Sequence, residues 1–174
     1  MDELWRHHLH AWGEFYVIVG GGAAALTGLL FVVISIAPHM VSARSVKSTR
    51  AFVTPTITYF ATALTVAGFM TMPSMTPEML AALLTLGGIA GLAYMVWIGA
   101  HRQWREAKLD LEDWVWFVGL PIVGYLTVLA AAVEVWLDSR FGLETVAVAM
   151  LLFLLIGIRN AWDLVLFMAQ QPRT

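Results

Sequence analysis

The sequence predicts an all-α membrane protein in which five helices cross the bilayer as one bundle. Apolar residues make up 60% of its 174 residues and charged residues only 13%, against about 45–50% and about 25% in a typical soluble domain. The mean hydropathy is +0.77. Five apolar runs reach the roughly 20 residues that a helix needs to cross a bilayer, namely 15–37, 52–72, 79–100, 114–137 and 145–169.

The segments outside these runs are too short to bury a hydrophobic core of their own. The prediction is therefore a single domain, the membrane bundle of residues 1–174. The first run ends on Ser35-Ile36-Ala37, which looks like a signal-peptide cleavage site. However, the run is too long for a signal peptide, Asp2 and Glu3 rather than a basic cluster precede it, and Pro38 follows the apparent site. We expect this helix to be retained.

The tail before the first run is rich in histidine. If the tail is helical, three potential metal ligands share one of its faces: His7, His10 and Glu14. Imidazole and carboxylate groups bind divalent metals, so an outer-face metal site is one interpretation, and a polar face at the membrane surface is the favoured one. No other cofactor is expected, because the chain has no cysteine and no histidine inside an apolar run.

The first run, residues 15–37, contains small residues at steps of four: Gly20, Ala24 and Gly28. Inside lipid, small residues let two helix backbones approach closely and gain dispersion contacts. We therefore predict that this face packs against another helix. Its partner is either a helix of the same bundle, which we favour, or a second subunit.

The second run, residues 52–72, carries four threonines on one helical face: Thr54, Thr58, Thr62 and Thr65. In a membrane helix, a threonine hydroxyl usually donates to the carbonyl four residues earlier. The alternative is a polar strip that lines a hydrated path. Pro55 lies either in the first turn of this helix or inside a longer helix that begins near Ser45 or Ser48.

The third run, residues 79–100, follows Thr76-Pro77-Glu78. These three residues offer an N-cap, a proline at the first helical position and an acid at the positive end of the helix dipole. Gly87 and Gly91 repeat the four-residue spacing of small residues, which predicts a second close helix contact.

The fourth run, residues 114–137, contains Pro121 two turns from its start. A proline lacks the backbone N–H and is expected to bend the helix at this point. Glu134 lies near the opposite end of the run, where we interpret it as an exposed carboxylate at the level of the lipid headgroups.

The fifth run, residues 145–169, has a polar wedge at its middle: Arg159, Asn160 and Asp163. The three side chains fall within about 100° on a helical wheel. Insertion scales assign about 2.5–3.5 kcal/mol to an arginine or aspartate at this depth, so the wedge must face protein or water. Arg159 and Asp163 are i,i+4 neighbours in the less favourable order for pairing, which hints at partners on other helices. The wedge is either a clamp that holds helices in register or a functional site.

The basic residues predict the orientation. Seven Lys or Arg residues lie on one side of the five runs and two on the other. By the positive-inside rule, we expect an outer N-terminus and a cytoplasmic C-terminus in a multi-pass protein of the bacterial cytoplasmic membrane. The seven are Arg44, Lys47, Arg50, Arg102, Arg105, Lys108 and Arg173, and the two are Arg6 and Arg140.

Residues 12–36, WGEFYVIVGGGAAALTGLLFVVISI, together with Ala161-Trp162, resemble a group of small five-helix bacterial membrane proteins. Some members of this group carry the label "modulator of FtsH protease". The resemblance is specific in the first helix and otherwise rests on topology. It implies a five-helix membrane fold and assigns no catalytic or binding residue.

Two function classes fit these observations. In the favoured class, an oligomer forms an ion or proton pathway: Arg159 sets the local field, Asp163 titrates or binds the ion, Asn160 supports it, and the threonines line the route. In the alternative class, the chain is a non-conducting regulatory or assembly subunit that docks a partner membrane protein. No enzyme motif is present, so no catalytic activity is expected. The net charge of −2 indicates no nucleic-acid partner. We expect lipid and further copies of the chain as partners.

Overall fold

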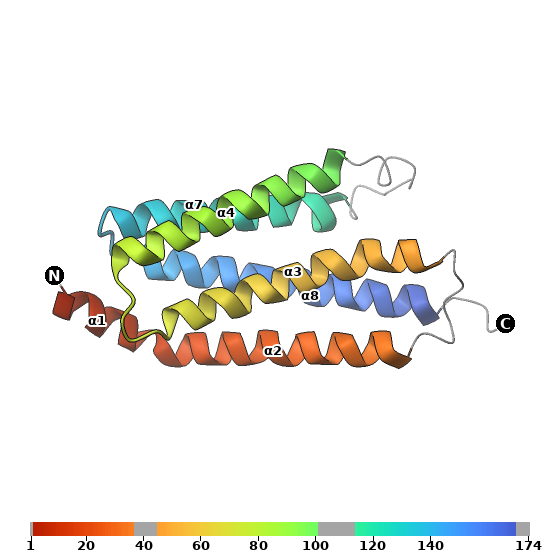
Figure 1. Cartoon of the computed structure of the whole chain (residues 1–174), viewed down its shortest axis with the longest axis horizontal. Helices are drawn as coiled ribbons and strands as arrows, with labels where there is room; N and C mark the ends of the chain where they lie inside the picture. The colour runs from red at the N-terminus through yellow and green to blue at the C-terminus, as the bar shows by residue number, and fades with distance from the viewer. Residues whose placement is uncertain (1, 37–44, 101–113, 170–174) are drawn as a thin grey trace.

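The computed structural model describes residues 2–36, 45–100 and 114–169, and side chains within 3–35, 53–98 and 114–166. The elements, coloured in chain order in Figure 1, are α1 (Asp2–Ala11), α2 (Gly13–Ile36), α3 (Ser45–Met70), α4 (Pro77–Ala100), the π-helix η2 (Val115–Gly119), α7 (Leu120–Trp136) and α8 (Gly142–Ala169).

Five helical segments are long and apolar enough to cross a membrane: Gly13–Ser35, Val53–Met70, Pro77–Ile98, Val115–Trp136 and Gly142–Leu166. Each lies within three residues of the predicted run at both ends. The prediction of a helical bundle with five helices long and apolar enough for a multi-pass membrane protein is thereby confirmed. The basic side chains of residues 44–50, 102–108 and 173, on which the predicted orientation rests, lie outside the described parts of the chain.

The helices pack in an order that differs from their order in the chain. α4 packs on α7, α7 on α8, α8 on α3, and α3 on α2, which also touches α8. Figure 1 shows α4 and α7 together along one flank of the bundle and α2 along the other. α3 and α4 follow each other directly but scarcely touch. Three aromatic rings join α3, α8 and α7 in the core. The centre of the Phe153 ring of α8 lies 6.0 Å from that of Tyr59 of α3, with the rings stacked, and 4.7 Å from that of Tyr125 of α7, with the rings tilted.

Two local predictions concern the starts of α3 and α4. α3 begins at Ser45, so Pro55 lies inside a long helix rather than in its first turn. At the start of α4, the backbone N–H of Met79 donates to the Thr76 hydroxyl at 3.2 Å. This is the predicted N-cap, and Pro77 occupies the first helical position.

The distortion predicted at Pro121 takes the form of a widened turn. In a regular α-helix, the proline ring would clash with the carbonyl four residues earlier. Here the preceding residues form the π-helix η2, whose final N–H bond runs from Leu120 to the Val115 carbonyl. A π-turn is one of the adjustments by which a helix accommodates such a site. It also sets the direction of the Trp116 side chain.

The N-terminal tail is helical and is anchored to one end of the bundle, here called the α1 end. The Trp5 Nε1–H donates to the Met75 carbonyl at 2.8 Å, in the turn between α3 and α4. Leu9 is buried beneath α1. Further along, the Tyr16 hydroxyl donates to the Leu143 carbonyl of α8 at 3.0 Å. The first two contacts hold α1 to the bundle beyond the start of α2, and the third ties the start of α2 to the start of α8.

The predicted small-residue faces divide between contacts and open surface. A Cβ added at Gly20 would lie 2.9 Å from Ala67 of α3, and one added at Gly91 would overlap the Tyr125 ring. By contrast, Ala24, Gly28 and Gly87 are exposed, and the two glycines have no atom within 4 Å of an added Cβ. Among the described residues, no close helix contact forms at Gly28 or Gly87, Ala24 lies on the surface, and contact of this face with a second subunit stays a prediction.

Candidate functional site

The charged residues of α8 pair with each other. The Arg159 Nη1 lies 3.0 Å from the Asp163 Oδ1, and their side chains are 35% and 23% exposed. The Arg159 guanidinium carbon also lies 5.9 Å from the centre of the Trp116 ring in η2, within reach of a cation–π attraction. The order of the pair, cation first along the helix, therefore does not prevent its formation, and η2 supplies the aromatic contact.

Asn160 points in a different direction from the ion pair. It is fully buried, and neither atom of its side-chain amide has a hydrogen-bond partner in the described parts of the chain. The turns on either side face α3, because Gly157 packs on Phe60 and Leu164 clusters with Ile57. The polar wedge is thus split between a half-exposed flank of α8 and the bundle interior. An unsatisfied buried polar group costs about 1–3 kcal/mol, so Asn160 is a site where water or a ligand group would be stabilised.

A groove separates α3 from α4, with a volume of about 420 Å³. Its walls combine the threonine face of α3 with small residues of α4, and α7 forms the floor. Sequence spacing identified five of its lining residues: Thr58, Thr62, Thr65, Gly87 and Gly91. Two further lining side chains, Tyr94 and Tyr125, carry hydroxyls that no spacing pattern singled out.

The hydroxyls of the groove differ in their hydrogen bonding. Thr58 donates to the Thr54 carbonyl at 2.9 Å, and Thr62 donates to the Thr58 carbonyl at 2.8 Å. These are the bonds to the preceding turn that the sequence favoured. The Tyr125 side chain is 2% exposed, and its hydroxyl has no hydrogen-bond partner in residues the structure describes. The Thr62 hydroxyl is the side chain near enough to pair with it, but it donates its own proton to the Thr58 carbonyl.

The groove and the polar wedge are separate. Arg159, Asn160 and Asp163 are absent from the residues that line the groove, and the ion pair faces η2 instead. A single route lined by both sets, as the pathway hypothesis requires, is therefore not assembled among the described residues of one chain.

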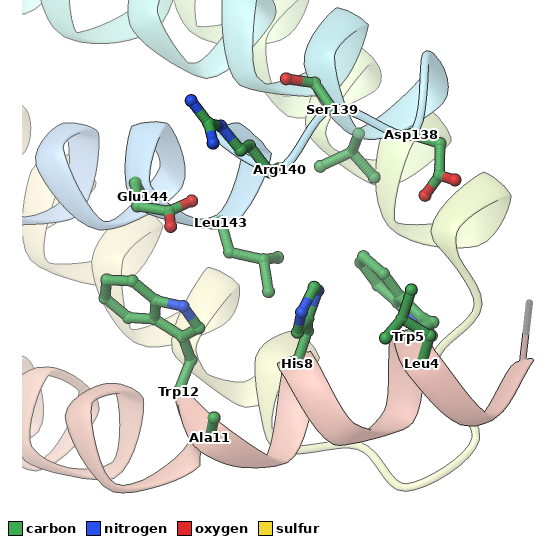
Figure 2. A pocket seen from close by; sticks show the side chains of 11 residues that line it. Leu4, Trp5, His8, Ala11, Trp12, Asp138, Ser139, Arg140, Leu143 and Glu144 are labelled. Atoms are coloured by element: carbon green, nitrogen blue, oxygen red, sulfur yellow. The ribbon is translucent and has the colours of Figure 1, made fainter.

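A second cavity of about 330 Å³ lies at the α1 end, between α1 and the turn that joins α7 to α8 (Figure 2). Its charged and aromatic lining residues are Trp5, His8, Trp12, Asp138, Arg140 and Glu144. Sequence reasoning did not bring these six residues together in one site, because the two segments are more than 120 residues apart and no local spacing links them.

The remaining predicted positions lie near this end. His7, His10 and Glu14 are exposed, and the described residues contain no group of three or more His, Asp or Glu side chains arranged to hold a metal ion. Glu134 was expected to be an exposed carboxylate. It is instead half-buried and accepts a hydrogen bond from the Thr145 hydroxyl at 2.5 Å, which joins α7 to α8.

Comparison with known proteins found no matching family model, no matching curated protein and no matching solved structure. The resemblance to proteins labelled as modulators of the FtsH protease therefore stays a prediction from the sequence.

Proposed function

We propose that this chain is a non-enzymatic membrane subunit that associates with a partner membrane protein or a further copy of itself through the flank of α8. The observation that carries the proposal is the half-exposed ion pair of Arg159 and Asp163 within a membrane-spanning helix. Lipid chains cannot hydrogen-bond to the exposed atoms of such a pair. Intramembrane charges almost always face protein or water, and a partner helix at this flank would add protein contacts to those that the pair makes within its own chain.

The hydrogen bonding of the groove supports a docking subunit over an ion or proton pathway. The hydroxyls of Thr58 and Thr62 already donate to carbonyls of their own helix, so neither requires a water molecule in the groove as its hydrogen-bond acceptor. The charges are not among the residues that line the groove with these hydroxyls, and Arg159 contacts Trp116 of η2 instead. Both facts weigh against a conduit built within one chain, and neither weighs against a docking subunit. We further propose the orientation with α1 outside and the end of α8 in the cytoplasm of a bacterium.

The test is association in membranes. The double variant Arg159→Leu/Asp163→Leu removes both charges of the pair together, so neither residue is left charged without the other. We expect it to lose the oligomer or the co-purifying membrane protein that the wild type retains after chemical cross-linking. Thr127→Val is the matched control, because this threonine of α7 only donates to the Val123 carbonyl. Unchanged association in the double variant would refute the proposal.

A pathway for ions or protons is the second candidate, and one observation favours it. The Asn160 amide and the Tyr125 hydroxyl are buried without partners in the described parts of the chain, and buried water commonly satisfies such groups. Flux through proteoliposomes that contain purified protein tests this candidate. If water at Asn160 carries protons, Asn160→Leu will abolish the flux, whereas absence of flux in the wild type eliminates the pathway.

A further inference from the structure

The cavity at the α1 end has rigid aromatic walls. Trp5 is held by its hydrogen bond to the Met75 carbonyl. Trp12 packs edge-on against Phe15, with ring centres 5.4 Å apart. Figure 2 shows Trp5, His8 and Trp12 rising from α1 towards the turn between α7 and α8, with Leu143 between the two sides. Walls fixed by other contacts lose little entropy when a ligand enters.

Charges of both signs line this cavity without neutralising one another. Arg140 supplies a cation, Asp138 and Glu144 supply carboxylates, and His8 supplies an imidazole. Arg140 lies over the Phe141 ring at 4.5 Å. In the part of the chain that the structure describes, no ion pair joins any two of the four lining groups. The cavity therefore presents separate binding positions for an anion and for a cation.

The backbone around Asp138 supports a role for its carboxylate. Asp138 has a φ of 55°, and α7 ends there with the N–H of Ser139 bonded to the Glu134 carbonyl and that of Asp138 to the Val135 carbonyl. Glycine is the usual residue at this left-handed position of a helix end, and aspartate is tolerated at a cost. The aspartate places a carboxylate in the cavity lining, where glycine would place none.

We propose that this cavity binds a zwitterion that carries an ammonium and a phosphate group, as in the headgroup of an ethanolamine or choline phospholipid. Arg140 binds the phosphate through charge-assisted hydrogen bonds. The ammonium has two candidate positions on opposite sides of Leu143 (Figure 2): one between Glu144 and Trp12, and one between Asp138 and Trp5. At either position a carboxylate attracts it and an indole ring adds cation–π attraction. A purely anionic headgroup would leave the two carboxylates unpaired beside its phosphate.

The place of the cavity favours a lipid as the source of this zwitterion. It lies at the ends of α7 and α8, beside the exposed side chains of Trp136 and Leu137. A bilayer around the five apolar helices puts headgroups at this level. A soluble phosphoethanolamine has the same charged groups, and the experiment separates the two sources.

The experiment measures lipid retained by the purified full-length chain in detergent, by native mass spectrometry. The probes are phosphatidylethanolamine, phosphatidylcholine and phosphatidylglycerol with identical acyl chains. We expect the two zwitterionic lipids to be retained about tenfold more strongly than phosphatidylglycerol. Competition by soluble phosphoethanolamine would show that the headgroup alone suffices, and retention without such competition would identify the lipid as the ligand. Both results support the proposal.

Two charge variants separate the roles of the lining residues. Arg140→Gln is expected to weaken retention of all three lipids about tenfold, whereas Glu144→Gln weakens only the zwitterionic ones. Arg6→Gln and Glu14→Gln remove the same charges from exposed positions outside the cavity and should change nothing. Ala11→Leu fills the cavity while keeping every charge, and it should abolish retention. Equal retention of phosphatidylglycerol by the wild type, or equal behaviour of Arg140→Gln and Arg6→Gln, would overturn the proposal.

Discussion

α4 faces its two neighbours in very different ways. Against α7 it packs closely: Cβ atoms added at Gly88 and Gly91 would overlap Leu129 and Tyr125. Against α3, which precedes it in the chain, it leaves the groove of about 420 Å³. A Cβ added at Gly87, on that side of α4, would have no atom within 4 Å. Lipid provides no hydrophobic drive that closes a gap between helices. Close packing therefore depends on which small residue faces which partner, and a gap persists where that match is missing.

The same difference governs the polar groups of the groove. The α4–α7 contact covers the ring of Tyr125 through Gly91, while its hydroxyl belongs to the lining of the groove. Close packing on one side of α4 thus holds a hydroxyl in place beside the open side. A groove of this kind is stable only as long as the close contact is kept, and substitutions on the two faces of α4 separate these contributions.

The largest expected effect comes from adding a methyl group at the close contact. Gly91→Ala must push the Tyr125 ring out of its place in the core, and such overpacking lowers the free energy of unfolding by about 1–3 kcal/mol. Gly87→Ala, four residues away, meets open space and should leave stability unchanged or raise it by up to about 1 kcal/mol. Unfolding in mixed detergent micelles, followed by tryptophan fluorescence, measures both. Equal effects at the two glycines would show that the groove is closed in the folded protein.

The comparison also shows what sequence can and cannot predict here. Span positions were predictable because bilayer thickness alone sets them, and the N-cap at Thr76 was predictable because capping is a local effect. Which glycine touches α7 was not predictable. Gly87 and Gly88 differ by about 100° around the helix, and only Leu129 and Tyr125, far along the chain, select Gly88 and Gly91.

The candidate site shows the same limit. The wedge of Arg159, Asn160 and Asp163 was predicted as one unit. In the structure, Arg159 and Asp163 pair on the half-exposed flank of α8, whereas Asn160 is buried in the bundle. A helical wheel gives relative angles but not the position of neighbouring helices. Arg159 pairs with Asp163 on its own helix, and the π-turn before Pro121 adds a contact with the Trp116 ring that no helical wheel of α8 could predict. The cavity at the α1 end was not predicted, because only the folded chain brings α1 next to the turn between α7 and α8, and no sequence motif links the two segments.

A smaller effect is expected from removing the tyrosine hydroxyl beside the groove. Tyr125→Phe deletes a buried hydroxyl that has no partner among the described residues, so the free energy of unfolding should stay constant or rise by about 1 kcal/mol. Tyr16→Phe is the matched control, because this hydroxyl donates to the Leu143 carbonyl, and it should lose about 1 kcal/mol. The same unfolding assay compares them. A loss at Tyr125 as large as that at Tyr16 would show that something in the groove binds the hydroxyl.

The smallest expected effect belongs to the threonines. Thr62→Val keeps the shape of the side chain and removes only a bond to the preceding turn, which should change the free energy of unfolding by less than about 0.5 kcal/mol. Thr85→Val makes the same change on α4 outside the groove, where the hydroxyl donates to the Ala81 carbonyl. Equal changes in the free energy of unfolding at the two sites mean that the groove makes no additional hydrogen bond to Thr62. A larger loss at Thr62 requires a second bond there, to the Tyr125 hydroxyl, to water or to a ligand, and the threonine face of α3 would then serve the groove as well as its own helix.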